Sequence, residues 1–362
     1  MAAKKLFAPL PEICRFVTDV MTAVGTPAEH AYAMSELLVA ADYRGHLSHG
    51  LNRLSMYVED VRNGTTDPCA TPEVIKEKSA VALVDGKNGL GPVVGNFCMD
   101  LAMEKAKETG VGWISARGTN HYGIAGWYSM RAANQGFVGI TCSNTSPVTA
   151  PLRSKKAAVG TNPISVAAPA KNDSFVLDMA TSTAALGKIE LKRSRNEDIP
   201  LGWAQDIDGN MTTNPDKALL ANCLMPLGGA EETSGYKGTG IALMVDIFSG
   251  ILSGANYGPF IRNWKNASEK ANLGQCFIAL DPSAFAPCFE ERLSNFLDVI
   301  RALEPVDPNK PVLVAGDPEK IHMKEVSYRG GILYHQGLID AMSKLAEELN
   351  ICPLRSTVVG TC

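Results

Sequence analysis

Apolar residues recur every three to four positions in several stretches of the chain, and this spacing predicts amphipathic helices. Short apolar runs between clusters of Gly, Pro, Asn and Asp predict strands. The segment Thr26-Pro27-Ala28-Glu29 combines a capping hydroxyl, an early proline and a first-turn glutamate, so a helix starts there. The predicted helices cover residues 11–24, 26–41, 51–62, 95–107, 218–224, 241–255, 289–303 and 336–349, and the predicted strands cover 80–84, 111–116, 137–141, 164–168, 174–179, 275–280 and 312–314.

Three glycines follow the strand at 80–84, and with the next helix and strand they outline a dinucleotide-binding unit. Gly89, Gly91 and Gly95 have the spacing G-x-G-x-x-x-G, which departs from the G-x-G-x-x-G of that unit. The next strand also leads to Arg117, where a ribose-binding site needs an acidic residue. The pattern therefore favours a strand–helix unit without a phosphate-binding turn.

The most apolar stretch covers residues 241–255 and predicts a buried helix, because it is too short for a bilayer and carries Asp246. The N-terminal segment has no apolar core of a secretory signal. The nine cysteines include no Cys-x-x-Cys pair, so we interpret them as small buried residues in a reducing compartment. A cytoplasmic protein without a membrane partner is expected.

The chain has 362 residues, which predicts about two domains. Lys plus Arg number 34 and Asp plus Glu number 38, for a net charge of −4. This balance lacks the strongly basic surface of a dedicated nucleic-acid binder, so no nucleic-acid partner is expected.

Glycine-flanked histidines at the ends of predicted elements are the first candidates for chemistry, because there an imidazole can meet a ligand. His46 and His49 lie in Arg44-Gly-His-Leu-Ser-His-Gly50, and His121 lies just after a strand. His46 and His49 could share a metal ion, but no third ligand has a fitting spacing, so no metal is expected. Each histidine taken alone is also compatible with a structural role.

Arg53 lies four residues after His49, so both side chains can project from one end of the helix predicted at 51–62. A guanidinium binds a carboxylate through two hydrogen bonds, and a neighbouring imidazole can exchange a proton with an adjacent carbonyl or hydroxyl. Ser48 lacks the surroundings of a nucleophilic serine and is expected to orient the imidazole or the substrate. These residues suggest a site for a 2-oxo acid or a 2-hydroxy acid.

With these residues in place, the chain resembles the type 2 malate/L-lactate dehydrogenase family, the group of L-sulfolactate dehydrogenase-like enzymes that also includes ureidoglycolate dehydrogenase and cyclic-imine reductases. The resemblance extends from Arg44-Gly-His-Leu-Ser-His-Gly-Leu-Asn-Arg53 through most of the chain in family order. The further matching segments are 119–125, 160–163, 177–181, 187–189, 236–238, 241–250 and 272–275.

The resemblance implies an α/β fold that is not a Rossmann fold, with a mixed or largely antiparallel sheet in the cofactor domain. It implies a helical substrate and dimerisation domain made of residues 1–115 with 325–362, and a nicotinamide-cofactor domain made of 116–324. It also implies a homodimer.

The same resemblance implies roles for individual residues. Ser48 and His49 match the family's Ser-His pair, and Arg53 matches the arginine that holds the substrate carboxylate. His121 matches a position that some members use as the acid/base, so two histidines compete for this role, of which we favour His49. Thr145 or Ser146 would contact substrate. The implied cofactor contacts are His121, Tyr122, Gly123, Thr161, Asp178, Met179, Ala180, Gly187, Lys188, Lys237, Ala315, Gly316 and Asp317.

The implied activity is hydride transfer between NAD(P) and a 2-hydroxy acid of the malate, sulfolactate or lactate type. A cyclic-imine reductase and an inactive binding member are the alternatives. A reductase of this family would carry Asp where this chain has Lys188, which favours a hydroxy acid. No basic residue lies within 312–317 to pair with a ribose phosphate, which favours NAD, with NADP as the alternative. The distal group of the substrate stays open.

Overall fold

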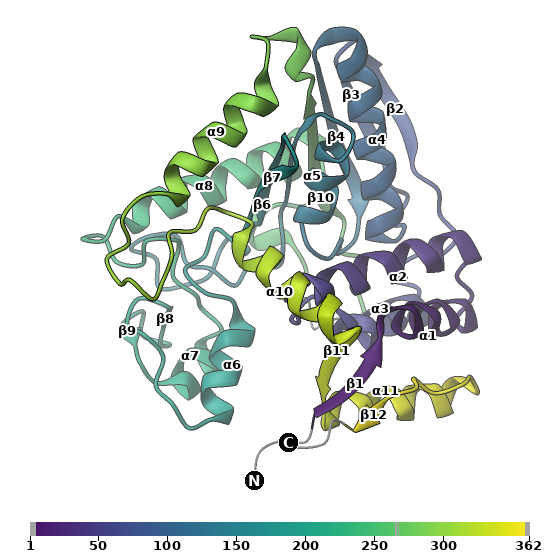
Figure 1. Cartoon of the computed structure of the whole chain (residues 1–362). Coiled ribbons are helices and arrows are strands. Elements are labelled where there is room, and N and C mark those ends of the chain that lie inside the picture. The colour runs from purple at the N-terminus through teal and green to yellow at the C-terminus, as the bar shows by residue number, and fades with distance from the viewer. Residues whose placement is uncertain (1–4, 265, 267, 359–362) are drawn as a thin grey trace.

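A seven-stranded mixed sheet forms the centre of the molecule in a computed structural model that describes residues 5–264, 266 and 268–358 (Figure 1). Strands β3 and β4 are parallel, and the other neighbouring strands are antiparallel. The expected non-Rossmann α/β fold with a mixed sheet is therefore confirmed. The strand order is β2 (Glu73–Lys78), β3 (Val81–Asp85), β4 (Val111–Thr119), β10 (Leu273–Leu280), β5 (Val138–Ser143), β6 (Ile164–Ala170) and β7 (Asp173–Met179).

Helices cover both faces of this sheet because its strands alternate apolar side chains between the two faces. Helices α4 (Gly91–Thr109) and α5 (Gly126–Ala133) pack on the face that carries Ile114 and Phe277. Helix α8 (Gly235–Asp246) continues into the π-helical turn η2 (Ile247–Ile251) on the other face. There the ring of Phe248 meets Trp113 edge-on, with centroids 5.0 Å apart.

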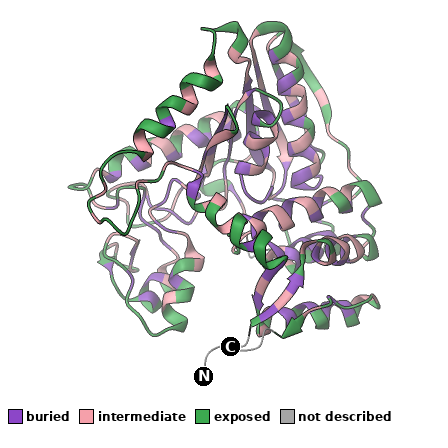
Figure 2. Cartoon of the chain, in the orientation of Figure 1, coloured by how far each residue is buried: buried purple, intermediate pink, exposed green. Residues whose placement is uncertain are grey.

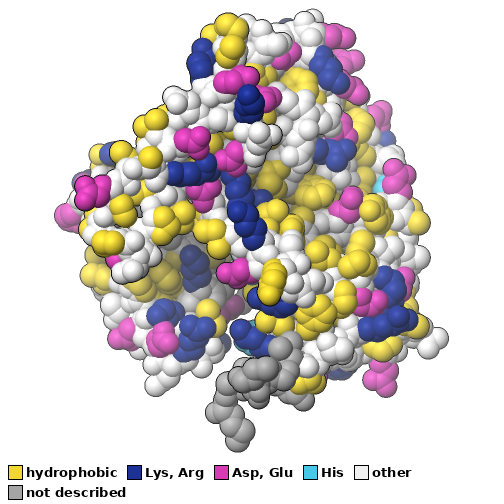
Figure 3. All heavy atoms as spheres, in the orientation of Figure 1, with side chains coloured by type: hydrophobic (Ala, Val, Ile, Leu, Met, Phe, Trp, Pro, Cys, Tyr) yellow, Lys and Arg dark blue, Asp and Glu magenta, His cyan; other side chains and the backbone are white. Residues whose placement is uncertain are grey.

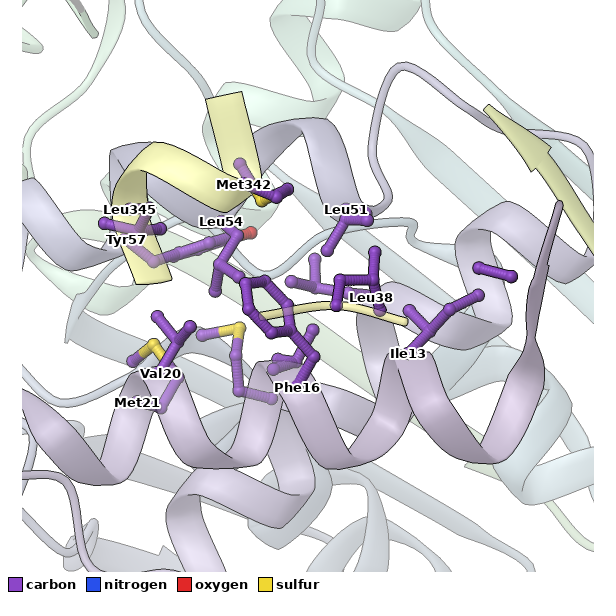
Figure 4. Close-up of a cluster of buried hydrophobic side chains, with 14 of the residues drawn as sticks. Ile13, Phe16, Val20, Met21, Leu38, Leu51, Leu54, Tyr57, Met342 and Leu345 are labelled. Atoms are coloured by element: carbon purple, nitrogen blue, oxygen red, sulfur yellow. The ribbon is translucent and has the colours of Figure 1, made fainter. Parts of the chain in front are cut away.

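Both ends of the chain share a second core. Strand β1 (Lys5–Pro9) pairs with β11 (Gly331–His335) and β12 (Thr357–Val358) in a small antiparallel sheet. Figure 4 shows Phe16, Leu38, Leu54 and Met342 meeting in this core. The helices that supply it are α1 (Leu10–Ala23), α2 (Ala28–Tyr43), α3 (Leu54–Arg62) after the 3-10 turn η1 (Leu51–Arg53), and α11 (Gln336–Leu349).

A third, smaller cluster lies around Ile189 and Leu224. Figure 2 shows the central strands largely buried, whereas α9 (Phe289–Arg301) and α11 have exposed faces. The remaining elements are α6 (Leu186–Ser194), β8 (Ala204–Gln205), β9 (Met211–Thr212), α7 (Pro215–Ala221), the 3-10 turns η3 (Gly258–Phe260) and η4 (Pro282–Ala284), and α10 (Asp317–Arg329).

The helix at 26–41 and the strands at 111–116, 164–168 and 275–280 are confirmed within a few residues. The strand predicted at 312–314 is wrong, because this segment is irregular and the Val314 amide donates to the Asp317 carboxylate. The sequence patterns missed several helices and strands, namely β1, β2, α5, α6, β8, β9, α10, β11 and β12.

The helix predicted at 241–255 starts earlier, at Gly235, and its expected burial is wrong along one side. Leu243, Ile247 and Ile251 are 45%, 50% and 53% exposed. Exposure of cysteines also departs from expectation, since Cys69, Cys288 and Cys352 are exposed, while all described cysteines are free thiols. No helix among the described residues is long and apolar enough to cross a membrane.

Gly91 and Gly95 allow close packing between α4 and neighbouring segments of the chain. A Cβ atom on Gly91 would lie 2.1 Å from the carbonyl oxygen of His121, and one on Gly95 would lie 2.3 Å from the ring of Tyr128. These glycines therefore let the start of α4 approach the segment that carries His121. The expected domain boundary at 115/116 lies inside β4, and the division into two domains stays a prediction.

Candidate active site

The loop between α2 and α3 brings Ser48, His49 and Arg53 together. The hydroxyl of Ser48 lies 2.8 Å from Nδ1 of His49, and Nε of Arg53 donates to the carbonyl of Ser48 at 2.7 Å. The His49 amide donates to the carbonyl of His46 at 2.8 Å, and the Arg53 amide donates to that of Gly50 at 2.9 Å, so the loop is a series of tight turns. The local sequence thus presents an imidazole and a guanidinium side by side.

The buried carboxyl group of Asp42 holds this loop in place. Oδ2 of Asp42 accepts hydrogen bonds from the Leu51 amide at 2.9 Å and from the Tyr334 hydroxyl at 2.5 Å. A Cβ on Gly50 would overlap this carboxyl group, at 1.8 Å from Oδ1. Burial raises the pKa of Asp42 to about 7. Asp42 therefore connects the loop to β11, near the other end of the chain.

His121 reaches the same place from the end of β4. Its ring stacks on that of His49, with centroids 5.8 Å apart and planes 18° apart. The hydroxyl of Tyr57 lies 2.6 Å from Nδ1 of His121, and the Gly123 amide donates to the same atom at 3.3 Å. Since an amide N–H can only donate, Nδ1 is an acceptor and the ring proton of neutral His121 lies on Nε2.

The surroundings keep both imidazoles neutral. Burial lowers the pKa of His49 to about 4, with further contributions from the positive charge of Arg53 and from the neighbouring His46. Burial lowers the pKa of His121 to about 3, assisted by His49 and Arg53. Two neutral imidazoles next to a guanidinium form a site suited to an anionic substrate that must gain or lose a proton.

One face of α3 and its preceding turn supplies Arg53, Tyr57 and Asp60, which are spaced by four and three residues. Their spacing could have identified Tyr57 and Asp60 from the sequence, but the partners of these residues are distant in the chain. Asp60 pairs with Arg262, and Trp264 lies over the guanidinium of Arg53 with 5.2 Å to the ring centroid. The sequence reasoning missed Tyr57, Asp60, Arg262 and Trp264.

Thr145 and Thr161 are neighbours, with their hydroxyl oxygens 3.4 Å apart. Thr145, the predicted substrate contact, follows β5, and Thr161, a predicted cofactor contact, precedes β6. The structure therefore brings these two predicted contacts next to each other. The hydroxyl of Ser146, the alternative substrate residue, donates to the carbonyl of Arg262 at 2.7 Å.

The structure places the turn at 315–317 against Val176 of β7, the strand that also carries Asp178 and Met179. The amide of Val176 in β7 donates to the carbonyl of Ala315 at 3.2 Å, and Gly316 has a positive φ of 98° against the same strand. Asp317 accepts two hydrogen bonds from Arg301 at 2.7 and 2.9 Å. The carboxylate of Asp317 therefore anchors the turn, and a ligand would meet the backbone of Ala315 and Gly316.

Asp178 is likewise committed to the protein, since its carboxylate accepts a hydrogen bond from the Gly126 amide at 2.7 Å. Burial raises its pKa, and the neighbouring charges of His46 and Arg44 oppose that rise. His46 approaches Glu319 at 3.7 Å. Met179 and Ala180 follow Asp178 at the end of β7 and could present backbone groups to a ligand.

Lys188 and Lys237 lie on other elements, at the starts of α6 and α8. Among the described residues, no hydrogen bond, ion pair or ring contact joins either lysine to the histidine pair. Figure 3 shows Lys and Arg side chains gathered around α6, next to a hollow on the side of α10. A cleft with a basic rim suits a ligand that carries phosphate groups.

Comparison with known proteins supplies the family. The profile of malate/L-lactate dehydrogenase matches residues 9–343. The chain belongs to the malate/L-lactate dehydrogenase family. A malate dehydrogenase of Pyrococcus horikoshii is 39% identical over 347 residues, which cover 95% of each chain. An L-sulfolactate dehydrogenase of Methanocaldococcus jannaschii is 36% identical over 339 residues, 93% of this chain and 95% of the relative.

The solved structures agree with this family assignment. The Pyrococcus horikoshii malate dehydrogenase superposes with a TM-score of 0.89 at 36% identity, covering 97% of both chains. A Δ1-piperideine-2-carboxylate reductase of Pseudomonas syringae superposes with a TM-score of 0.83 at 26% identity, covering 94% of this chain and 99% of the reductase. The chain is therefore an oxidoreductase of the hydroxy-acid dehydrogenase type.

Two further relatives bear on the cofactor. A ureidoglycolate dehydrogenase (NAD⁺) of Escherichia coli is 30% identical over 87% of this chain and 89% of its own length. A (2R)-3-sulfolactate dehydrogenase (NADP⁺) of Chromohalobacter salexigens is 33% identical over 79% of this chain and 84% of its own length. Both names specify a nicotinamide cofactor, but one specifies NAD⁺ and the other specifies NADP⁺, which carries an additional phosphate on the ribose.

Proposed function

We propose that this protein oxidises a 2-hydroxy acid of the malate, sulfolactate or lactate type to the 2-oxo acid, and catalyses the reverse reduction. The observation that carries the proposal is the group formed by Arg53, the neutral His49 imidazole and the stacked ring of His121. The relatives named malate dehydrogenase and L-sulfolactate dehydrogenase support the same substrate class.

Arg53 would bind the substrate carboxylate. Its Nε is held by the carbonyl of Ser48. Within the described residues, its terminal Nη atoms make no hydrogen bond to protein, so they are available for a carboxylate. Thr145, whose hydroxyl neighbours that of Thr161, is the second proposed contact to the substrate.

His49 would accept the hydroxyl proton in oxidation and return it in reduction. We propose that Nδ1–H of His49 donates to Ser48 Oγ, which lies 2.8 Å away, so that Nε2 is the basic atom. His121 differs, because its Nδ1 accepts from Tyr57 and Gly123 and its Nε2 carries the proton. His121 is thus arranged to donate a hydrogen bond to the substrate oxygen. This difference supports His49 as the acid/base.

The residues present fit a nicotinamide dinucleotide, which accepts or supplies the hydride when bound. Gly187 in the first turn of α6 has no atom within 4 Å of where a Cβ would lie, so this helix start is open to a ligand. Helix N-termini and lysines are suited to phosphate groups, and Lys188 is exposed there. Besides Gly187 and Lys188, the candidate contacts are His121, Tyr122, Gly123, Thr161, Asp178, Met179, Ala180, Lys237, Ala315, Gly316 and Asp317.

We infer that the cofactor is NAD, because no basic residue lies within 312–317 to pair with a ribose phosphate. We also propose a homodimer in the cytoplasm. The exposed apolar residues Leu243, Ile247 and Ile251 recur every four positions on α8 and η2, and a second copy of the chain would cover them.

The test is the consumption of NADH, and separately of NADPH, with oxaloacetate, sulfopyruvate, pyruvate and piperideine-2-carboxylate. The expected result is turnover of a 2-oxo acid, with NADH preferred. His49→Ala is expected to lower kcat by about 10²–10⁴-fold.

Turnover of piperideine-2-carboxylate alone would indicate a cyclic-imine reductase. Binding of NADH without turnover of any of the four compounds would indicate an inactive binding protein. Near-normal turnover of His49→Ala, together with loss of turnover in His121→Ala, would transfer the acid/base role to His121.

A further inference from the structure

Asp60 and Arg262 form a buried ion pair beside the candidate site. Their side chains are 11% and 6% exposed, and one guanidinium nitrogen of Arg262 lies 2.9 and 3.0 Å from the two carboxylate oxygens of Asp60. The hydroxyl of Thr65 also donates to the Asp60 carboxylate, at 3.0 Å. Asp60 belongs to α3, one turn beyond Tyr57, so this pair joins the helix of the site to a segment 202 residues away in the chain.

The other terminal nitrogen of Arg262 binds backbone carbonyls of the loop that follows this residue. It donates to the carbonyls of Asn266 at 2.9 Å and Glu269 at 2.6 Å. The hydroxyl of Ser146 donates to the carbonyl of Arg262. We use "the Arg262 loop" for the described residues 261–264, 266 and 268–271. The shape of this loop therefore depends on one guanidinium that is itself bound to α3.

The Arg262 loop carries Trp264, whose ring lies over the guanidinium of Arg53 at 5.2 Å. An aromatic face attracts a guanidinium and leaves the edge of the guanidinium, with its N–H groups, directed away from the ring. Nε of Arg53 is already committed to Ser48. The indole and the Ser48 carbonyl together restrict the orientation of the remaining N–H groups.

We propose that the Asp60–Arg262 pair is a latch that positions Trp264 against Arg53 and thereby orients Arg53 toward the substrate carboxylate. Asp60, Arg262 and Trp264 are positioning residues, since they act through Arg53. This inference rests on the proposed role of Arg53. It predicts that loss of the latch weakens substrate binding more than it slows the reaction.

The experiment compares the full-length wild-type protein with Asp60→Asn, Trp264→Ala, Trp264→Phe and the double variant Asp60→Asn/Trp264→Ala. Asp100→Asn is the matched control, because Asp100 forms a two-point ion pair with Arg131 between α4 and α5, away from the latch. Two readouts are used, initial rates with oxaloacetate and NADH, and hydrogen exchange of backbone amides in the Arg262 loop without substrate. The variant Trp264→Ala removes no member of the hydrophobic cores described above.

We expect Asp60→Asn and Trp264→Ala each to raise KM for oxaloacetate by about tenfold, with kcat within about twofold and KM for NADH unchanged. Trp264→Phe retains a ring and should restore most of the affinity. The double variant should have a KM for oxaloacetate no higher than that of the more affected single variant, because both substitutions disrupt the same interaction. Exchange in the Arg262 loop should accelerate at least about tenfold in Asp60→Asn.

Unchanged KM in Trp264→Ala, additive effects in the double variant or an equal effect of Asp100→Asn would overturn the proposal. So would unchanged hydrogen exchange in Asp60→Asn. If the wild-type protein turns over no 2-oxo acid, the proposed function fails, and hydrogen exchange still decides whether the latch orders the loop.

Discussion

The hydroxyl of Tyr57 lies 2.6 Å from Nδ1 of His121, although the two residues are 64 positions apart in the chain. Tyr57 is buried against this ring, and burial raises the pKa of its phenol, so it stays a hydrogen-bond donor at neutral pH. The contact, together with the Gly123 amide, sets which nitrogen of His121 carries the proton, and it supports the different roles that we propose for the two stacked histidines.

The variant Tyr57→Phe is expected to lower kcat by about three- to tenfold, the effect of losing one hydrogen bond of about 0.5–1.5 kcal/mol. The measurement is steady-state kinetics together with ¹⁵N chemical shifts of the His121 ring, which report the tautomer. Tyr43→Phe is the control, because that hydroxyl contacts Ser327 at an exposed position. Equal losses in both variants would contradict a specific role for Tyr57.

The positive charge of Arg53 depresses the pKa of His49, second only to burial. Oxidation of a hydroxy acid needs neutral His49, so kcat/KM should stay level at neutral pH and fall as pH drops through about 4. Replacing Arg53 by Gln removes a charge that disfavours imidazolium, and the pKa of His49 should rise. NMR titration of the imidazoles checks this, with Arg131→Gln as the charge-matched control; an unshifted midpoint in Arg53→Gln would refute the argument.

Asp42 makes stability depend on pH in a predictable direction. Burial raises its pKa from 3.8 to about 7 in the folded protein, so the folded state binds more protons than the unfolded state between these values. The free energy of unfolding from this group therefore falls as pH rises from about 4 to about 7, by up to about 4 kcal/mol.

Asp42→Asn should remove this dependence, since an amide does not titrate in this range. The amide oxygen can keep both hydrogen bonds because Oδ2 accepts them both, and Oδ1 has no hydrogen-bond partner in the described part of the chain. Denaturant unfolding of both proteins across this pH window is the measurement. Parallel curves for wild type and variant would show that Asp42 is not the titrating group.

Gly91 has no room for a side chain, because a Cβ there would lie 2.1 Å from the carbonyl oxygen of His121. Gly91→Ala should destabilise the protein by about 1–3 kcal/mol and lower kcat, because His121 must shift. Gly337→Ala is the control, since a Cβ at that position meets no atom within 4 Å. The prediction fails if both variants unfold at the same denaturant concentration.

The apolar stripe on α8 and η2 predicts a contact between copies. Ile247→Glu and Ile251→Glu place a charge on residues that are half exposed in a single chain, so each should convert a dimer into a monomer. Light scattering after gel filtration measures the mass. Phe296→Glu on the exposed face of α9 is the control; if it dissociates the protein while the other two do not, the interface lies on α9.

Much of the candidate site could be predicted from local sequence. Ser48, His49 and Arg53 lie within six residues, and tight turns bring their side chains together in a loop that Asp42 and Tyr334 fix in place. Arg53, Tyr57 and Asp60 share one face because an α-helix repeats every 3.6 residues. The prediction of a strand at 312–314 was wrong because a side chain outside this apolar run determines its conformation. The Asp317 carboxylate accepts a hydrogen bond from the Val314 amide.

The sequence by itself determined the family, the mixed α/β character and the loop that joins an imidazole to a guanidinium. Only the tertiary structure decided that His121 stacks on His49, that Tyr57 sets the proton of His121 and that Arg262 reaches Asp60. The physical reason is the range of the interactions. Helix and turn preferences act over a few residues, whereas these contacts depend on packing between elements up to 202 residues apart, which no local pattern encodes.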